Sequence, residues 1–326
     1  MRQSTMRTSA NMTFMVIGES LLDDVQRGSI HTTHPGGSPL NVAVGLARLE
    51  RNVTLVTRIG DDDPGADIAD YLAESGVRLY PGSIDEHPTS IAYAQLNELG
   101  NASYTFDVRS DYPLPHCDGI SPKPRLVHIG SLGAHLEPGA TALRAWLECL
   151  GGHSTVSYDP NVRLSMMGPQ EKLLAEVDEL MPFIDVVKAS VDDMEAMLGP
   201  TTPEKSARFF LDRGAQLVVI TMGAGGLNLV TPMVDVHVPA VNVGVVDTVG
   251  AGDSLMSSLI DGLARMSVLG GEDGEALQSI SRQGLASLGA YAAAAAGITV
   301  ARPGSNSPTR EELAKATDLY SPDPVY

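Results

Sequence analysis

The stretch "VGVVDTVGAGDSL" (residues 243–255) carries the strongest local signal in the sequence. An apolar run from Val243 to Val246 is followed by glycines, and a helical pattern begins near Gly252. We expect a strand, a tight glycine turn and a helix start, which leave backbone N–H groups unpaired at one spot. The helix dipole adds positive potential there, so the turn is suited to bind an anion such as phosphate.

Asp253 follows this predicted anion site directly, although a carboxylate repels phosphate. A carboxylate is useful at this position if it removes a proton from a hydroxyl that attacks the phosphorus. The alternative is an acidic residue in the first helical turn that only interacts favourably with the helix dipole. The stretch alone leaves both interpretations open.

The letters Gly252-Asp253-Ser254-Leu255 also match a motif of certain esterases. A Ser254 nucleophile needs a histidine base, which in those hydrolases follows the serine in the chain. All eight histidines of this sequence precede Ser254. We therefore reject the esterase interpretation.

Composition narrows the class of protein. The chain has 326 residues, of which 43% are hydrophobic and 19% charged, as is ordinary for a folded protein. Its net charge of −18 argues against a nucleic-acid or anionic-membrane surface, because either partner requires a basic patch. No apolar run predicts a membrane span or a signal peptide, so we expect a cytoplasmic protein with Cys117 and Cys149 as unpaired thiols.

Short apolar segments alternate with helical patterns along most of the chain. Predicted strands are 14–19, 53–60, 125–132, 154–159, 185–190, 217–223 and 243–247, and predicted helices are 38–50, 63–75, 138–150, 169–181, 191–198, 203–213 and 310–317. This order predicts an α/β fold with a doubly wound, mostly parallel sheet flanked by helices. Two further segments, 90–108 and 225–240, read as hairpins. The first of them, together with a short strand within 25–33, predicts a small β-sheet lid over a site.

The segment "HPGGSPLNVAVGLARL" (34–49) is the second informative stretch. Gly36 and Gly37 precede a predicted helix and allow close backbone approach to a ligand. Asn41, in the first turns, offers both a donor and an acceptor, which suits a polyhydroxylated ligand. A plain loop before a helix explains the same letters equally well.

Polar residues follow several of the predicted strands. Asn161 and Arg163 follow the strand that ends at Asp159, and Lys188 and Ser190 end another strand. Sites in α/β proteins form at the carboxyl ends of parallel strands, and arginine is suited to hold phosphate or carboxylate. Each of these segments is weak evidence alone.

Taken together, segments 34–49 and 247–254 resemble the N-terminal and C-terminal signatures of the ribokinase-like, or PfkB, carbohydrate kinases. The resemblance implies a single ribokinase-like domain over residues 13–318, with lid strands at roughly 23–34 and 88–110. Residues 1–12 and 319–326 would be tails. The implied reaction transfers the ATP γ-phosphoryl group to a sugar hydroxyl, with ATP, Mg²⁺ and K⁺ as cofactors and a homodimer through the lid as a further expectation.

The resemblance also implies roles for individual residues. Asp253 would be the catalytic base, and the backbone of Gly250, Ala251 and Gly252 would form the anion hole. The implied sugar-binding residues are Asp23, Gly36, Gly37, Asn41 and Arg163. The implied nucleotide-binding residues are Lys188, Ser190, Thr221, Gly223 and Gly226. Asp247 and Gly304 would belong to the monovalent-cation site.

The subfamily follows from shorter motifs. "DPNVR" (159–163) and "KAS" (188–190) resemble the fructokinase branch and its 2-keto-3-deoxygluconate kinase relatives. The sequence departs from that branch at Met166 and Met167, where Leu-Trp is common, and near Ala293, where an asparagine is common. We expect a fructokinase. The alternatives are a 2-keto-3-deoxygluconate kinase or a ribokinase and, from another class, a catalytically silent sugar- or nucleotide-binding regulator.

Overall fold

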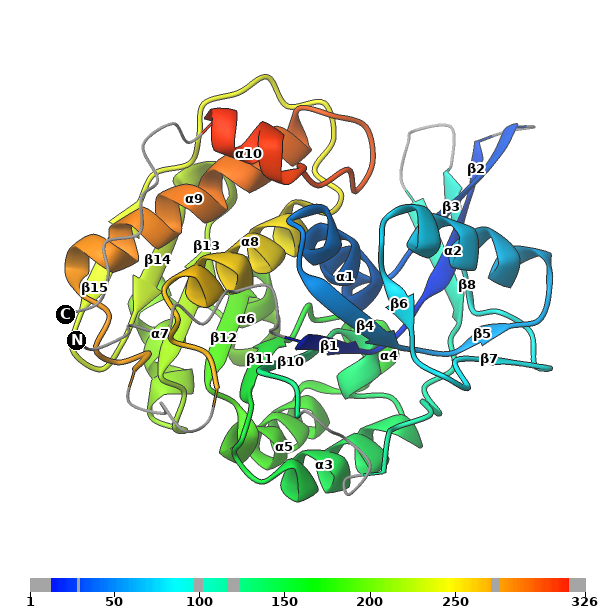
Figure 1. Ribbon diagram of the computed structural model, residues 1–326, viewed down its shortest axis with the longest axis horizontal. Coiled ribbons are helices and arrows are strands. Elements are labelled where there is room, and N and C mark those ends of the chain that lie inside the picture. Colours follow the sequence, from blue (N-terminus) through cyan, green and yellow to red (C-terminus); the bar gives the residue numbers. More distant parts are fainter. Residues whose placement is uncertain (1–12, 28–29, 97–101, 117–122, 271–275, 317–326) are drawn as a thin grey trace, which may run out of the picture.

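The computed structural model describes residues 13–27, 30–96, 102–116, 123–270 and 276–316. In this part of the chain, the central sheet has nine strands in the order β15-β14-β13-β12-β11-β10-β1-β4-β6 (Figure 1). Their bounds are β1 Thr13–Ile17, β4 Asn52–Val56, β6 Arg78–Leu79, β10 Leu126–Gly130, β11 Thr155–Asp159, β12 Val186–Ser190, β13 Leu217–Thr221, β14 Leu227–Val230 and β15 Asp235–Val238. All neighbouring strands from β6 to β13 pair in parallel, and only β14 and β15 add antiparallel pairs. The predicted doubly wound, mostly parallel sheet is confirmed.

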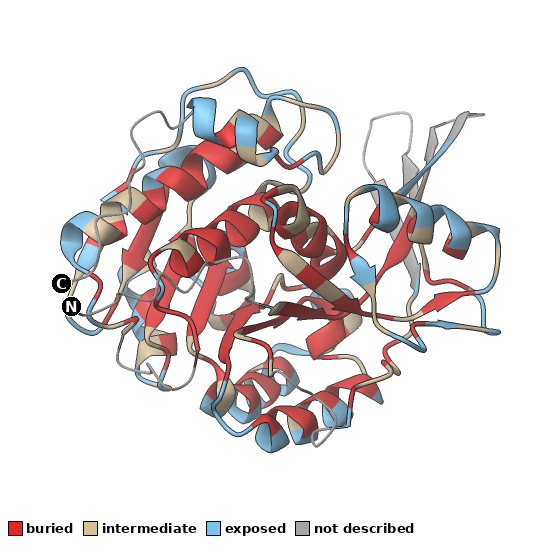
Figure 2. Ribbon diagram, in the orientation of Figure 1, coloured by how far each residue is buried: buried red, intermediate tan, exposed pale blue. Residues whose placement is uncertain are grey.

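Helices cover both faces of this sheet and form two hydrophobic cores with it. One core includes residues of α1 (Ser38–Arg48), α2 (Asp63–Glu74), α8 (Ala251–Arg265) and α9 (Arg282–Val300). The other includes residues of α3 (Gly139–Leu150), α5 (Gln170–Leu180), α6 (Val191–Leu198) and α7 (Pro203–Leu211). The short α4 (Leu164–Met167) follows β11, and α10 (Arg310–Ala316) packs on α9. Because both faces are covered, strands such as β10 and β11 are buried at every position (Figure 2).

A separate four-stranded sheet projects from one end of the molecule (Figure 1). It contains β3 (Ile30–Gly36), β2 (Leu21–Arg27), β8 (Ile91–Leu96) and β9 (Ala102–Asp107) in that order. The predicted small sheet is therefore present, with two strands rather than one in the segment around 25–33. The turn of the predicted 90–108 hairpin lies outside the described residues.

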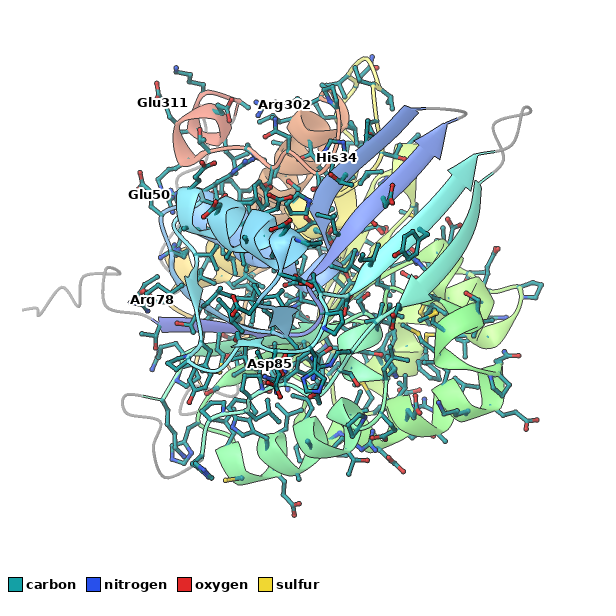
Figure 3. All side chains as sticks on the ribbon, turned by 90° about the vertical axis from the view of Figure 1, so that its right-hand side faces the viewer. His34, Glu50, Arg78, Asp85, Arg302 and Glu311 are labelled. Atoms are coloured by element: carbon teal, nitrogen blue, oxygen red, sulfur yellow. The ribbon has the colours of Figure 1, made fainter. Side chains whose placement is uncertain are left out.

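A cluster of ion pairs lies where the small sheet joins the body. Arg109, just after β9, contacts Asp85 of β7 (Ile84–Asp85) at 3.0 Å and Asp111 at 2.7 Å. Arg58, just before β5 (Ile59–Gly60), reaches the same Asp85 carboxylate at 3.1 Å. Figure 3 labels Asp85. These arginines hold the pKa of Asp85 down to about 2. The carboxylate therefore stays ionised and keeps its pairs over the whole physiological pH range.

Two expectations from the sequence are wrong. Residues 243–247 do not form a strand: the backbone N–H groups of Val246 and Asp247 both donate to the carbonyl of Val300. The apolar run is instead a surface loop, with Val245 65% exposed, and its backbone is hydrogen-bonded to the end of α9 rather than to a strand. Cys149 is disulfide-bonded rather than a free thiol, and Cys117 lies outside the described residues.

Among the described helices, none combines the length and the apolar character needed to cross a lipid bilayer.

Helices α1 and α8 are tied together along their length. Near their starts, Ser38 and Asn41 of α1 contact Asp253 of α8. Further along, a side chain on Gly45 would come within 2.4 Å of Ser257, so the two helices touch closely there. At the far end, Arg51 donates to Asp261 of α8 at 2.5 Å. Both helix N-termini therefore lie at the same edge of the sheet.

We predict that Asp261→Ala lowers the free energy of unfolding by about 3–5 kcal/mol, measured by urea denaturation. Asp261 is fully buried and also accepts from Tyr291 at 2.7 Å and Arg310 at 3.0 Å. Its loss leaves Arg51, which is 9% exposed, as an uncompensated buried charge. Glu50→Ala is the control, because Glu50 pairs with Arg310 from an exposed position and its loss costs less than about 1 kcal/mol. Equal effects of the two substitutions would contradict the prediction.

Candidate active site

The two informative segments of the sequence meet at the carboxylate of Asp253. The Ser38 hydroxyl donates to Oδ1 of Asp253 at 2.7 Å, and the Asn41 amide donates to Oδ2 at 2.8 Å. The residues of the second pair are 212 positions apart in the chain. Because α1 and α8 both begin at this edge of the sheet, their first turns bring these groups together.

The surroundings of Asp253 keep its carboxylate ready to accept a proton. Burial raises its pKa, while the hydrogen bonds from Ser38 and Asn41 and the charges of Lys188 and Arg163 oppose that rise. A carboxylate with a raised pKa is a better proton acceptor than one with an ordinary pKa. This arrangement is able to act as a general base toward a hydroxyl placed beside it.

The turn before α8 presents its backbone to the same spot. Gly250 caps the helix with φ of 74°, in the left-handed region, and a side chain there would come within 2.5 Å of Ser305. Glycine is therefore required on both conformational and steric grounds. The first N–H groups of α8 have no acceptor within the helix, and with the helix dipole they form a site for an anion.

Lys188 adds a positive charge to this anion site. A side chain on Gly252 would come within 2.9 Å of the Lys188 ammonium, which shows how close the lysine lies to the turn. The ammonium also pairs with Asp159 at 2.7 Å, and both residues are buried. Burial raises the pKa of Asp159 to about 6 against the opposing charge of Lys188. One buried cation thus connects the end of β11 with the start of α8.

A cavity of about 520 Å³ opens beside the turn. Its walls include the predicted Thr221, Gly223 and Gly226 on one side and Ala251 and Gly252 on the other. The remaining lining residues are mostly small or apolar, among them Val241, Val243, Val245, Leu255, Ala293, Ala296, Gly297 and Val300, and Asn242 and Thr248 are polar. A pocket of this size with apolar walls and one polar end is suited to a flat ring with a charged extension.

Two residues predicted for the nucleotide are not in the wall of this cavity, although one of them, Lys188, lies against Gly252, which is part of that wall. Among the described residues that line this cavity, Lys188 and Ser190 do not appear. Ser190 is the N-cap of α6, where its hydroxyl and backbone N–H donate to Asp193. The other oxygen of Asp193 accepts from the backbone N–H of Val162 at 2.7 Å. Asp193 therefore holds the loop that carries Asn161 and Arg163, a role that the Ser-x-x-Asp capping pattern could have indicated.

The small sheet places the predicted Asp23 beside the predicted Gly36, just before α1. A side chain on Gly36 would come within 2.1 Å of the Asp23 carboxylate, so the two predicted residues are in contact. Burial raises the pKa of Asp23 to about 6, and the charge of His34, its cross-strand neighbour, opposes this rise. Gly37 follows Gly36 and is the N-cap of α1, the helix whose first turn contacts Asp253. Arg163 is exposed and donates to the carbonyl of Val162 at 2.9 Å.

Glu19 is a site residue that the sequence did not reveal. It follows β1, is only 2% exposed and accepts from the backbone N–H of Gly133 at 2.7 Å. Burial raises its pKa to about 7 against hydrogen bonds from Ser131 and Gly133, and the charge of Asp253 raises it further. An acid directly after an apolar strand is the signal that could have identified it. Asn161 follows β11 and has a φ of 39°, and its side-chain amide donates to the Ser131 hydroxyl at 3.1 Å.

The predicted cation-site residues are in contact. Asp247 accepts from the backbone N–H of Gly304 at 2.9 Å and from that of Val249 at 3.0 Å. These hydrogen bonds lower the pKa of Asp247, so it remains ionised. Ser254, by contrast, is 1% exposed and accepts from the Thr299 hydroxyl, which leaves no room for a nucleophilic role.

Comparison with known proteins identifies the family. The model of pfkB family carbohydrate kinases matches residues 8–312, so the chain belongs to this family. A putative sugar kinase from Pyrococcus horikoshii is 27% identical over 312 residues, which are 92% of this chain and 94% of that protein. A fructokinase from Klebsiella pneumoniae is 30% identical over 263 residues, which are 76% of this chain and 83% of that protein.

A solved structure shows the same fold. It is a fructokinase double mutant from Vibrio cholerae with fructose, ADP and potassium ion bound, and it matches with a TM-score of 0.76 and 25% identity. The match covers 95% of this chain and 99% of that one. The protein is therefore a ribokinase-like carbohydrate kinase, and its relatives support the fructokinase branch.

We predict that Glu19→Gln removes part of the pH dependence of stability. Because the pKa of Glu19 is raised to about 7 in the folded state, that state keeps its proton between about pH 4.5 and 7 while the unfolded chain loses it. As the pH rises through this interval, the free energy of unfolding of the wild-type protein therefore falls by about 3 kcal/mol more than that of the variant. Urea denaturation at pH 5 and pH 8 measures the difference. The exposed Glu74→Gln on α2 serves as control, and parallel curves for Glu19→Gln and wild type would contradict the prediction.

Proposed function

We propose that this carbohydrate kinase is a fructokinase that uses Asp253 as its catalytic base. The observation that carries the proposal is the meeting of three features at the first turn of α8. These are a carboxylate held by Ser38 and Asn41, an anion site formed by backbone and lysine, and a ligand-sized cavity. A phosphoryl transfer to a hydroxyl needs these three parts side by side.

In the proposed reaction, Asp253 accepts the proton of the sugar hydroxyl as its oxygen bonds to the γ-phosphorus of ATP. The bond between that phosphorus and the β,γ-bridging oxygen breaks, and ADP leaves. The N–H groups of Gly250, Ala251 and Gly252 would face the charge on the transferring group, and Lys188 adds a cation at the same place. Mg²⁺ bound with ATP would supply further neutralisation of the phosphate charge.

The two substrates would bind on either side of this turn. We assign the nucleotide to the cavity at Thr221, Gly223 and Gly226, which ends at the anion site. Lys188 would contact the phosphates, whereas the hydroxyl of Ser190 is already bound to Asp193. The proposed sugar-binding residues are Asp23, Gly36, Gly37, Asn41 and Arg163.

Support for fructose comes from the relatives. The fructokinases from Klebsiella pneumoniae and Escherichia coli are both 30% identical to this chain. The Vibrio cholerae structure contains fructose, ADP and a potassium ion. We likewise propose a monovalent-cation site at Asp247 and Gly304, supported by the contact between the two residues.

Two wider proposals follow from the reaction and from the small sheet. A kinase that consumes ATP fits the cytoplasm, where that nucleotide is abundant.

The small sheet ends in two edge strands, β3 and β9, and such edges are able to pair with a second copy of the chain. A homodimer through this sheet is therefore part of the proposal.

We predict that Asp253→Asn lowers kcat by about 10³-fold or more, at the upper part of the range for general-base effects. Asparagine keeps the shape of the side chain and cannot take the proton. Binding of ATP and of sugar, measured by calorimetry, should remain within a few-fold of wild type. Ser254→Ala, one residue further along α8, is the control and should keep most of the activity. Near-normal turnover of Asp253→Asn would exclude this residue as the base.

The sugar assignment is tested by ADP production across a panel of acceptors. We expect the highest kcat/KM with fructose, compared with ribose, 2-keto-3-deoxygluconate, tagatose 6-phosphate and nucleosides. A preference for 2-keto-3-deoxygluconate would indicate that Arg163 binds the substrate carboxylate instead. No turnover with any acceptor, together with sugar and ATP binding, would favour a silent regulator.

A further inference from the structure

Two residues at the active-site edge of the sheet have an unusual backbone. Among the described residues, the non-glycine residues with a positive φ are Glu50, Ser131, Asn161 and Ser267. Glu50 and Ser267 follow the C-terminal ends of α1 and α8, where a left-handed residue is a common way to end a helix. Ser131 and Asn161 instead follow strands β10 and β11, with φ of 52° and 39°. A positive φ of this kind is typical of functional sites.

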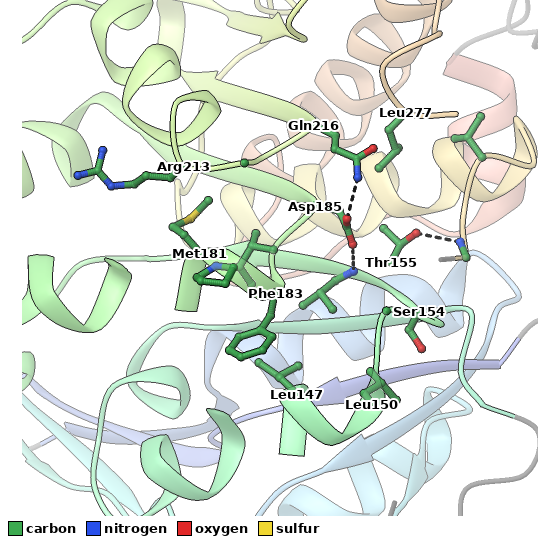
Figure 4. A pocket seen from close by; sticks show the side chains of 17 residues that line it. Leu147, Leu150, Ser154, Thr155, Met181, Phe183, Asp185, Arg213, Gln216 and Leu277 are labelled. Atoms are coloured by element: carbon green, nitrogen blue, oxygen red, sulfur yellow. Dashed lines mark hydrogen bonds between the residues drawn. The ribbon is translucent and has the colours of Figure 1, made fainter. Parts of the chain in front are cut away.

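Contacts between strand ends also occur at the other edge of the sheet, where the backbone is ordinary. Asp185, just before β12, accepts from the backbone N–H of Val156 at 2.8 Å and from the side-chain amide of Gln216 at 3.0 Å (Figure 4). These contacts join β11, β12 and β13, and none of the three residues has a positive φ. Joining strand ends therefore does not by itself explain the conformations of Ser131 and Asn161.

A chain of hydrogen bonds fixes the direction in which the Asn161 side chain points. In its ionised form, the buried carboxylate of Glu19 accepts from the Ser131 hydroxyl and from the backbone N–H of Gly133. A serine hydroxyl has one proton, so Ser131 then offers only lone pairs to Asn161. The side-chain amide nitrogen of Asn161 donates to Ser131 Oγ at 3.1 Å, as this direction requires. Asn161 thus turns its amide nitrogen toward Ser131 and its Oδ1 away.

The Oδ1 atom of Asn161 is available to a ligand. No group among the described residues donates to it. It is also not one of the buried side-chain atoms without a partner, so it reaches solvent. An amide oxygen accepts hydrogen bonds and a sugar hydroxyl donates them, so the two groups are complementary.

This oxygen belongs to the part of the site proposed for the sugar. Asn161 does not line the nucleotide cavity. At one end of the hydrogen-bond chain, a side chain on Gly37 would come within 2.6 Å of the Glu19 carbonyl oxygen. At the other end, Arg163 lies two residues after Asn161, and its charge opposes the rise in the pKa of Asp253. The chain therefore runs between two proposed sugar-binding residues, Gly37 and Arg163.

We propose that Asn161 is a further sugar-binding residue, whose Oδ1 accepts a hydrogen bond from one hydroxyl of the acceptor sugar, and that Ser131 is the positioning residue that orients it. This inference rests on the proposed function, because it adds a contact to the sugar that the kinase phosphorylates. The hydroxyl concerned is not the attacking one, which faces Asp253 in the proposed reaction. Because Ser131 orients Asn161 before the sugar arrives, little side-chain freedom is lost on binding.

The first test measures ADP production at pH 8, above the pKa of about 7 of Glu19, with the acceptor that has the highest kcat/KM. We expect Asn161→Ala to raise the KM for the sugar about five- to tenfold, the usual effect of one hydrogen bond. The KM for ATP should stay close to the wild-type value. Asn161→Gly gives the same comparison with a residue that adopts φ of 39° without strain, in case the alanine variant folds poorly.

Deoxy analogues of the sugar identify the contact itself. Each analogue lacks one hydroxyl that is not phosphorylated. Wild type and Asn161→Ala should use one of these analogues equally well, because the hydrogen bond is absent from both reactions. The other analogues should still show the loss caused by Asn161→Ala. The same loss for every analogue would mean that Asn161 contacts none of these hydroxyls, and it would overturn the proposal.

Ser131→Ala tests the positioning role. It should raise the KM for the sugar by a smaller factor than Asn161→Ala does. The double variant should match Asn161→Ala alone, because Ser131 acts only through Asn161. Ser206→Ala is the matched control, since Ser206 is buried on α7 and its hydroxyl has no partner among the described residues. Ser131→Gly replaces the alanine variant if that variant does not fold.

The remaining outcomes separate this inference from the proposed function. An unchanged KM for the sugar in active Asn161→Ala and Asn161→Gly would overturn the sugar contact while the kinase assignment stands. Additive effects of Ser131→Ala and Asn161→Ala would overturn the positioning role. No turnover of any acceptor by the wild type would refute the proposed function and this inference with it.

Discussion

The site depends on the parallel packing of α1 and α8. Their N-termini converge because the helices are joined at three levels, from Asn41 with Asp253, through Gly45 with Ser257, to the buried contact at the far end. Because the N-termini of α1 and α8 lie together, the positive potentials of their two helix dipoles add at the Asp253 carboxylate. This potential favours the charged form of Asp253 and any phosphate beside it. A shift of either helix would separate the Asp253 carboxylate from Ser38 and Asn41, which hold it.

Several acidic side chains also lie near the N-termini of these two helices. Glu19, Asp159 and Asp253 lie near one another, and burial raises the pKa of each. Lys188 is the buried cation that faces two of them, pairing with Asp159 and lying against the turn before α8. Perturbed carboxylates grouped around a cation are typical of functional sites. Here they make the charge of the site responsive to pH near neutrality through Glu19.

Most elements and half of the site could be predicted from local patterns. Apolar runs and helical periodicity located the strands and helices, because buried elements need apolar residues at fixed spacing. The same rule failed for residues 243–247, where exposed valines form a loop that is hydrogen-bonded to Val300. Glu19 was missed for a different reason: its role arises from Gly133 and Asp253, which are remote in the chain.

The sequence by itself determined the class of fold and indicated that its two glycine-containing segments allow close backbone approach to a ligand. Those features depend on neighbouring residues, since a glycine turn before a helix exposes backbone donors wherever it occurs. Only the tertiary structure decided that Ser38 and Asn41 hold Asp253, and that Lys188 is buried against Asp159. Such contacts join strand ends and helix starts far apart in the chain. They follow from the order of strands in the sheet and the packing of helices on it, which no local pattern specifies.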